Sequence, residues 1–335
     1  MGTRRTAPVA QLDLFKGADP LAPVYREAAE LVARLPERLH LGTSSWFFPG
    51  WEGLVWSGRF SESDLAREGL REYARHPLLT TVGIDRSFYA PVPAADFARY
   101  ASQLPPGFRC AIKAPASVTS AVVPHRPRGD AEANRDYLSI ERFRADLGDA
   151  LVSSFLPHTA MVILEFPRAP RALTGDPRSF AQRLARFIGD VDPRIPVAVE
   201  LRDPTLLQTA YAQALADAGA AHVYSMHAHM PLPGAQRAVV PLRRQPFAVL
   251  RLSLPPHTNY DERKQDFAPF DRLRDVDPAR RDDVLSVLRE ALALDRDTWV
   301  LVNNKAEGSA PLTLRAIAQA LAARQGDGFN NSTFR

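Results

Sequence analysis

The stretch PVAVELR at residues 196–202 decides the fold. Apolar residues occupy its odd-numbered positions from 197 to 201, and the even-numbered positions carry Ala198, Glu200 and Arg202. Successive side chains of a strand point to opposite faces, so one face of this strand is apolar and the other ends in two charges. A short, mostly apolar run of this kind predicts a buried parallel strand with charged side chains at its carboxyl end.

Seven similar runs lie on both sides of this strand, and amphipathic stretches separate most of them. The other predicted strands are 39–43, 78–84, 108–113, 160–166, 221–226, 247–253 and 298–304. The predicted helices are 62–75, 94–104, 134–151, 178–188, 204–218, 279–294 and 311–323, and the stretch 227–246 after the sixth strand is expected to be a loop. Asp-Pro pairs at 176–177, 203–204 and 277–278 are typical of helix starts, with Asp as the N-cap.

Eight strands that alternate with helices predict a closed parallel barrel of the (β/α)8, or TIM-like, class, which takes about 250 residues. The alternative is an open, doubly wound sheet. That fold would favour a G-x-G-x-x-G turn after the first strand, and none follows residues 39–43. The expected organisation is an N-terminal helical extension over 1–38, a single barrel domain over 39–322 and a flexible C-terminal tail over 323–335.

Composition excludes several classes of protein. The 335 residues are 45% hydrophobic and 24% charged, with 42 basic and 38 acidic residues and a net charge of +4. These values are ordinary for a globular protein and exclude a disordered chain, a fibre and a disulfide-stabilised miniprotein. The single cysteine, Cys110, permits neither an intrachain disulfide nor a cysteine-based zinc motif. No apolar run is long enough to span a membrane, so we expect a cytoplasmic protein without a membrane partner.

The basic residues are almost all arginine. Only four are lysine, namely Lys16, Lys113, Lys264 and Lys305, and the arginines are spread along the chain. This distribution is weak support for a nucleic-acid partner, because a binding surface would gather its charges. The rarity of lysine draws attention to Lys113 and Lys305, since a lysine in such a chain can mark a place that needs a compact ammonium group.

The carboxyl ends of barrel strands carry the functional residues of this fold, so side-chain alternation predicts the site. It directs five charged residues toward the barrel mouth: Lys113, Glu165, Glu200, Arg202 and Arg251. Further candidates follow the ends of strands one, two and eight: Trp46, Asp85, Tyr89, Asn303, Asn304, Lys305 and Glu307. Among these, Lys113, Glu165 and Glu200 are the candidate catalytic residues, and the others are candidate ligand-binding residues.

Several of these residues also have a purely structural interpretation. Glu200 and Arg202 could form an ion pair that only stabilises the barrel interior. The aromatic residues between 46 and 56 could pack as a plug over the barrel or form a stacking platform for a sugar or a base. The pair at 303–304 suits a turn as well as it suits a ligand. His227 and His229 have the spacing of two metal ligands but no evident partners, so we expect neither a bound metal nor a cofactor.

Four segments occur together in a characteristic order: GTSSWFFPGWEGLVW (42–56), VGIDRSFYAPVPAADFARYASQLPPGFRCAIKAP (82–115), VAVELRDP (197–204) and VLVNNKAEGSAP (300–311). Through them the chain resembles the YecE-like family, a domain of unknown function (domain of unknown function 72), over about residues 39–322. The resemblance implies a TIM-barrel-like fold. A likeness of that barrel to endonuclease-IV-like enzymes suggests nucleic-acid or phosphate chemistry.

The chain departs from the family pattern at three places. The pattern usually has Asn at position 85 and Gln at position 165, where this chain has Asp85 and Glu165. The seventh strand ends in RLSL (251–254) in place of an RLHG-like sequence. The histidine and carboxylate ligands of an endonuclease-IV zinc site have no evident counterparts here, which weakens the nuclease analogy.

Three functions remain open from the sequence. The first is an enzyme, conceivably a hydrolase, that binds a small phosphorylated or carboxylated anion at the barrel mouth, with Glu165 or Glu200 as general acid or base. The adjacent carboxylates would also permit a retaining glycosidase. The second is a nucleic-acid-binding or endonuclease-IV-like phosphodiester hydrolase, and the third is a non-catalytic scaffold. The sequence does not predict the oligomeric state.

Overall fold

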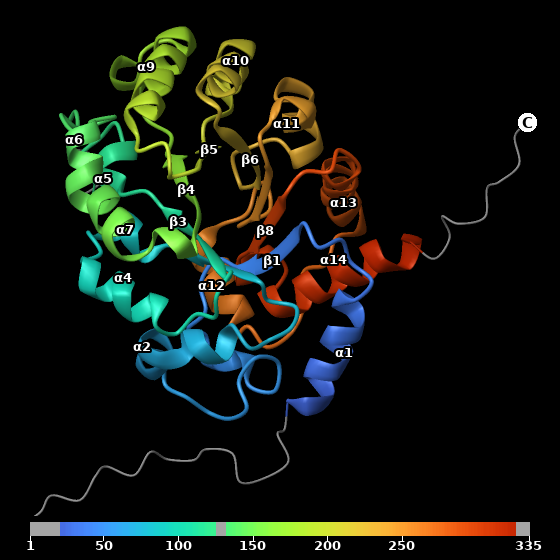
Figure 1. The fold of residues 1–335 in the computed structure, drawn as a ribbon. Coiled ribbons are helices and arrows are strands. Elements are labelled where there is room, and N and C mark those ends of the chain that lie inside the picture. The colour runs from blue at the N-terminus through green and yellow to red at the C-terminus, as the bar shows by residue number, and fades with distance from the viewer. Residues whose placement is uncertain (1–20, 125–131, 326–335) are drawn as a thin grey trace, which may run out of the picture.

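The protein is a closed barrel of eight parallel strands in chain order, surrounded by helices (Figure 1). The computed structural model describes residues 21–124 and 132–325. The strands are β1 (Leu39–Thr43), β2 (Thr81–Ile84), β3 (Arg109–Lys113), β4 (Thr159–Phe166), β5 (Val197–Leu201), β6 (Ala221–Met226), β7 (Ala248–Leu252) and β8 (Thr298–Val302). All eight predicted strands and the predicted closure are confirmed, with small shifts at the strand ends.

The helices that cover the strands correspond to the predicted amphipathic stretches. They include α2 (Glu62–Tyr73), α4 (Ala94–Ala101), α9 (Pro177–Asp190), α10 (Thr209–Ala218), α13 (Pro278–Ala293) and α14 (Ala310–Gln325). The helix predicted over 134–151 begins later, as α6 (Ile140–Phe143), and passes through a π-helical turn (Arg144–Gly148) into α7 (Asp149–Ser154). Short helices α3 (Arg86–Tyr89), α5 (Ala116–Thr119), α8 (Arg171–Thr174) and α12 (Tyr260–Phe267) lie in the connections.

The prediction of a loop over 227–246 was wrong in part. Helix α11 (Pro233–Val239) lies there and packs on α13. Its first residue is Pro233, and proline is favoured at the first position of a helix. The neighbouring prolines nevertheless gave so short a helix the sequence pattern of a loop. The backbone N–H of Gly234 donates a hydrogen bond to Asp283 Oδ2 at 2.9 Å. This contact with α13 joins residues 49 positions apart, so no local pattern could reveal it.

The three Asp-Pro pairs act as helix starts, as predicted. Asp176 accepts hydrogen bonds from the backbone N–H groups of Arg178 and Ser179 at the start of α9. Asp277 accepts one from the N–H of Arg280 at the start of α13. Asp203 caps a 3-10 turn, Pro204–Leu206, that precedes α10. These caps fix the points at which the chain leaves the barrel rim for the outer helices.

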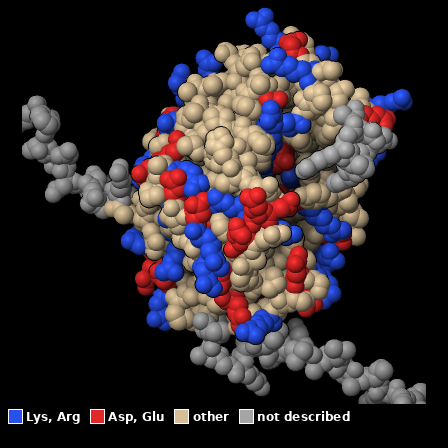
Figure 2. Space-filling model, turned by 180° about the vertical axis from the view of Figure 1, so that it is seen from behind, with Lys and Arg blue, Asp and Glu red and all other residues tan. Residues whose placement is uncertain are grey.

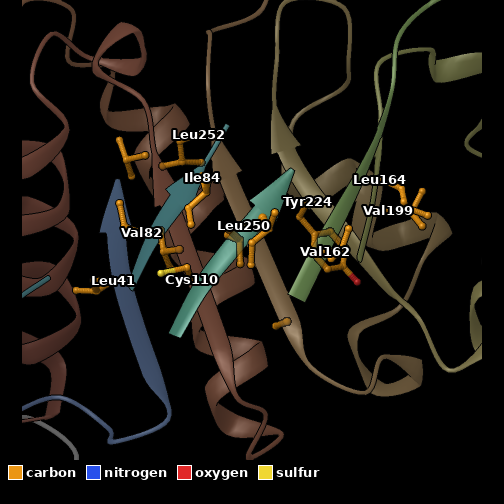
Figure 3. Packing of buried hydrophobic residues seen from close by; sticks show 14 of the residues in the cluster. Leu41, Val82, Ile84, Cys110, Val162, Leu164, Val199, Tyr224, Leu250 and Leu252 are labelled. Carbon is orange, nitrogen blue, oxygen red and sulfur yellow. The ribbon is translucent and has the colours of Figure 1, made fainter. Parts of the chain in front are cut away.

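Alternation along the strands sorts the core into two sets of side chains. Residues such as Val199, Leu250 and Cys110 belong to the large cluster between the strands and the helices, and Figure 3 labels side chains of this set along successive strands. The opposite faces of the same strands form a second, smaller cluster inside the barrel: Ala111, Ala160, Met161, Ile163, Ala198, Ala221, Val223, Val249, Trp299 and Leu301. The predicted alternation is therefore confirmed, and the interior below the mouth is apolar.

The predicted extension and tail fall partly outside the described residues. Helix α1 (Ala22–Val32) lies within the predicted N-terminal extension and packs on α14. Residues 1–20 and 326–335 are not described, and α14 continues past the predicted end of the barrel domain at 322. Across the ranges that the structure describes, no helix combines the length and the apolar character needed to cross a membrane.

Candidate functional site

Six charged side chains form one layer above the apolar interior, at the carboxyl ends of the strands. We call this layer the mouth network, and it consists of Asp85, Lys113, Glu165, Glu200, Arg202 and Arg251. The register of the sheet places them together: Glu165 on β4 is paired with Glu200 on β5. Five of the six were predicted to converge from alternation, and the structure brings them together with Asp85.

Glu165 lies at the centre of the network. Its Oε2 atom accepts hydrogen bonds from Arg202 Nη2 and Arg251 Nη1, both at 2.8 Å, and lies 3.0 Å from Lys113 Nζ. The Lys113 ammonium also lies 3.6 Å from the centre of the Phe88 ring. One carboxylate oxygen thus holds three cations from three different strand ends, so the relative positions of these cations depend on Glu165.

Glu200 and Asp85 are the other two carboxylates of the network. Glu200 is fully buried, and its Oε1 and Oε2 atoms lie 2.7 Å from Arg202 Nη2 and Arg251 Nη1 respectively. Arg251 Nη2 donates a hydrogen bond to Asp85 Oδ2 at 2.7 Å. Asp85 precedes α3 but its side chain does not cap that helix, which leaves the carboxylate free to reach β7. Arg251 therefore connects opposite sides of the barrel mouth.

The mouth network is electrically balanced. Three cations, Lys113, Arg202 and Arg251, face three carboxylates. Burial by itself would raise the pKa of Glu165, but the charges of Arg202, Lys113 and Arg251 outweigh it and hold that pKa well below its ordinary value. Burial would lower the pKa of Arg251, whereas its carboxylate neighbours raise it well above the ordinary value. Both groups are therefore charged at neutral pH.

A pocket of about 400 Å³ opens directly above the network, and we call it the mouth pocket. Its lining includes the predicted residues Asp85, Tyr89, Lys113, Glu165, Arg202, Arg251 and Asn303. The remaining lining residues are Phe88, Pro167, Arg168, His227, His229, Ser253, Leu254 and Tyr260. The volume lies in the range of pockets that hold small molecules, about 300–1,000 Å³. Glu200 is not among the lining residues, so it lies beneath the pocket and supports the arginines from there.

Three residues that line the pocket each carry a buried polar atom with no hydrogen-bond partner within the described ranges. These atoms are Arg202 Nη1, His227 Nδ1 and Ser253 Oγ. Arg202 is only 8% exposed, and its other terminal nitrogen already serves both glutamates. Buried polar groups are nearly always hydrogen-bonded, because leaving one unsatisfied costs about 1–3 kcal/mol. Their gathering in one pocket therefore indicates a place where polar groups of a ligand or solvent bind.

Arg168 adds a positive charge at the rim of this pocket. It follows β4 in sequence, is exposed, and forms no ion pair with any residue in 21–124 or 132–325. Because the network below is balanced, Arg168 gives the pocket a surplus of positive charge. Alternation could not predict it, since the argument applies only within strands and Arg168 lies two residues beyond the end of β4.

The two histidines after β6 both line the mouth pocket. Their ring centres lie 5.7 Å apart, but no group of three or more His, Cys, Asp or Glu side chains in the described part of the chain could hold a metal ion. Burial, together with the nearby charge of Arg202, lowers the pKa of His227 to about 3. His227 is therefore neutral at pH 7 and can exchange hydrogen bonds with a bound molecule.

Four predicted ligand-binding residues do not line the mouth pocket. Asn304 is buried and accepts hydrogen bonds from Trp51 Nε1 and from the backbone N–H of Ala310. Glu307 forms a two-pronged ion pair with Arg281 of α13, at 2.7 Å for both bonds. These contacts arise where the chain after β8 turns through a 3-10 segment, Asn304–Ala306, and no longer follows the alternation of a strand.

Lys305 and Trp46 are the other two predicted ligand-binding residues that do not line the mouth pocket. Lys305 is 5% exposed, and its Nζ atom lies 4.1 Å from the centre of the Tyr260 ring. It therefore supports one wall of the pocket from behind. Trp46 is buried, and its indole N–H donates a hydrogen bond to the backbone oxygen of Leu65. Trp51 and Trp56 are fully buried as well, so the aromatic residues after β1 form chiefly a packed plug, as the structural interpretation had it.

The fold and the mouth pocket together define a (β/α)8 barrel with a charged, ligand-sized site at the carboxyl ends of its strands. Comparison with known families is consistent with this class: residues 40–333 match the family model described as "Protein of unknown function DUF72". This chain belongs to that family.

Solved structures of the family have the same fold. A DUF72 family protein from Thermotoga maritima is 18% identical, with a TM-score of 0.56 over 84% of this chain and 98% of that one. A DUF72 family protein from Enterococcus faecalis is 15% identical, with a TM-score of 0.55 over 85% of this chain and 95% of that one. At these identities the likeness shows the fold alone. No curated protein matched the chain.

Proposed function

We propose that the mouth pocket binds a small anionic ligand, phosphorylated or carboxylated, and that the protein is an enzyme acting on it. The observation that carries the proposal is the unsatisfied Nη1 of Arg202, which is buried on the pocket wall while Nη2 of the same guanidinium holds Glu165 and Glu200. A fixed guanidinium with a free N–H pair suits a phosphate or carboxylate oxygen. The surplus charge of Arg168 supports the same ligand class.

The neutral donors and acceptors of the pocket would orient such a ligand. Ser253 Oγ can donate or accept, and the neutral His227 ring can do either, depending on its tautomer. Lys113 lines the same pocket as Ser253 and His227, and its own neighbours are Glu165 and Phe88. A ligand oxygen that reached Arg202 Nη1 would thus meet uncharged hydrogen-bonding groups as well as cations, which favours a compact polar anion over a bare ion.

The chemistry open to the two glutamates is narrower than the sequence suggested. Glu165 is ionised far below neutral pH, so it cannot serve as a general acid at pH 7. Glu200 is fully buried beneath the pocket. A retaining glycosidase would need both carboxylates to flank the scissile bond, but two arginine nitrogens already lie between them. We therefore assign both glutamates the role of positioning Lys113, Arg202 and Arg251, whose fixed charges would stabilise negative charge during a reaction.

A nucleic-acid-binding function has less support. The tryptophans that could have formed a stacking platform are buried in the plug. On the face of the molecule that Figure 2 shows, basic and acidic side chains are interspersed, and nothing there resembles a basic stripe. We also propose a cytoplasmic location, with which a single, buried cysteine is compatible.

Titration calorimetry with inorganic phosphate and with acetate tests the proposal. We expect saturable binding of at least one of them at a stoichiometry near one per chain, weakened in Arg168→Gln by the loss of the rim charge. Arg178→Gln is the matched control, because Arg178 is also exposed but lies on α9 and does not line the pocket. The proposal would be contradicted if neither anion binds, or if Arg168→Gln and Arg178→Gln lose the same amount of affinity.

A further inference from the structure

A second pocket adjoins the mouth pocket and has a different chemical character. Its volume is about 500 Å³, and Asp85 and Tyr89 line both pockets, so the two share a wall. We call it the side pocket. Its other lining residues are Ser45, Trp46, Phe47, Ala66, Arg67, Ile84, Arg86, Arg99 and Tyr100. The helices and loops after β1 and β2 thus build a continuation of the site, and Asp85 is the one member of the mouth network that lines it.

Four of the eleven residues that line the side pocket are aromatic, and two of these four rings are fixed in place. The Trp46 ring meets the rings of Phe47 and Tyr100 edge-on, with centre distances of 5.6 and 5.5 Å. The Trp46 N–H is bonded to Leu65, and the Tyr100 hydroxyl accepts from Arg86 Nη1, so neither ring can turn without losing a bond. The buried Trp46 and Tyr100 rings thus form a fixed backing, and the half-buried Phe47 and the exposed Tyr89 are the aromatic side chains with surface to offer a further ring.

Charge at the rim of the side pocket limits the character of its occupant. Arg86 and Arg99 share a single carboxylate, that of Asp96, at 2.9 and 3.1 Å. Arg67 has its own partner, Asp64. Three guanidinium groups therefore face two carboxylates, and the rim carries a surplus of one positive charge. A cationic group would be repelled there, whereas an electron-rich aromatic ring would be attracted.

We propose that the ligand has two parts: an anionic group bound in the mouth pocket and an aromatic ring bound in the side pocket, with Tyr89 between them. This inference rests on the proposed function for the anionic part and adds the substrate class. Tyr89 suits the boundary, because its side chain is 63% exposed and contributes to both walls. Phe47 is then a specificity-determining residue, since it is half-buried and lines only the side pocket.

This inference can be tested with two pairs of probes, in each of which only one member carries an aromatic ring. The pairs are inorganic phosphate against 1-naphthyl phosphate, and acetate against 1-naphthoate. In titration calorimetry we expect the naphthyl member to bind about tenfold tighter or more, because it buries apolar surface that the small anion lacks. Phe47→Ala should reduce that preference while leaving the affinity for the small anion unchanged. Phe60→Ala is the matched control, because Phe60 is also half-buried but does not line either pocket.

The outcomes separate this inference from the proposed function. Equal affinities within each pair, or a naphthyl preference that Phe47→Ala leaves intact, would overturn the two-part ligand and leave the anion site standing. Failure of all four probes to bind would overturn the proposed function together with the inference. If Phe47→Ala lowers stability, the comparison of the two members of a pair in the same variant still isolates the ring contribution.

Discussion

The lower and upper layers of the barrel interior come from the same strands but differ completely in chemistry. In the lower layer Ile163, Ala198 and Val249 pack without polar atoms. Two residues further along those strands stand Glu165, Glu200 and Arg251, all buried and all charged. Apolar residues of similar size could have filled the upper layer, since replacing buried ion pairs by well-packed apolar groups is often neutral or stabilising. The difference supports our proposal that the upper layer serves binding, whereas the lower layer serves stability.

The largest expected effect distinguishes the two layers directly. Glu165→Gln leaves the buried Lys113 with the neutral oxygen of an amide and removes one carboxylate partner each from Arg202 and Arg251, and we expect a loss of about 3–5 kcal/mol in the free energy of unfolding. Ile163→Val, two residues earlier in the lower layer, should cost only about 0.5–1.5 kcal/mol. Urea unfolding of both variants makes the comparison. The same Glu165→Gln change raises the positive charge of the mouth, so affinity for inorganic phosphate should increase in whatever fraction remains folded.

A smaller effect is expected for Lys113→Met. Glu165 keeps its two arginine partners in this variant, so the expected loss is that of one charged hydrogen bond, about 1.5–3 kcal/mol. Affinity for phosphate should fall, because the pocket loses one of its cations. Lys305→Met is the control, since Lys305 is buried to a similar degree but lies outside the pocket lining. If both variants bind phosphate equally well, Lys113 has no part in binding.

Alternation along the strands predicted the site as far as the strands extend. It placed Lys113, Glu165 and Arg251 correctly because a period of two fixes which side of a strand faces the axis. It did not extend to Lys305 and Glu307, which were candidates only because they follow the end of β8, where the chain enters a 3-10 turn. Arg168 and Tyr260 were missed for a related reason: they lie in connections whose course depends on contacts between distant segments.

Acid should weaken the upper layer directly, because its interactions depend on charged groups, whereas Ile163, Ala198 and Val249 of the lower layer carry no titratable group. The pKa of His227 is lowered to about 3, whereas in an unfolded chain it is about 6.5. Its contribution to stability is therefore complete above about pH 6.5 and is lost progressively as the pH falls toward 3. The depressed pKa of Glu165 acts in the same direction, but only below about pH 4.3.

Comparison of the free energy of unfolding at pH 7.5 and pH 5 isolates the histidine. Between pH 7.5 and pH 5 we expect the free energy of unfolding to fall by about 1 kcal/mol more in the wild-type protein than in His227→Gln. This figure allows for solvent screening of a partly exposed ring. Other buried histidines, such as His222 with a pKa of about 4, contribute equally to both proteins and cancel in the difference. An identical loss in both proteins would show that His227 is protonated as readily in the folded as in the unfolded state.

The central claim is that the free side of the Arg202 guanidinium binds an anion, and Arg202→Lys tests it most directly. Lysine keeps the positive charge next to Glu165 and Glu200 but has no second nitrogen to occupy the place of Nη1. The measurement is a calorimetric titration of the wild type and the variant with phosphate or acetate, whichever binds the wild type more tightly. We expect saturable wild-type binding and an affinity at least about tenfold lower in the variant, equivalent to about 1.4 kcal/mol. Unchanged affinity in Arg202→Lys would contradict an anion site at Arg202.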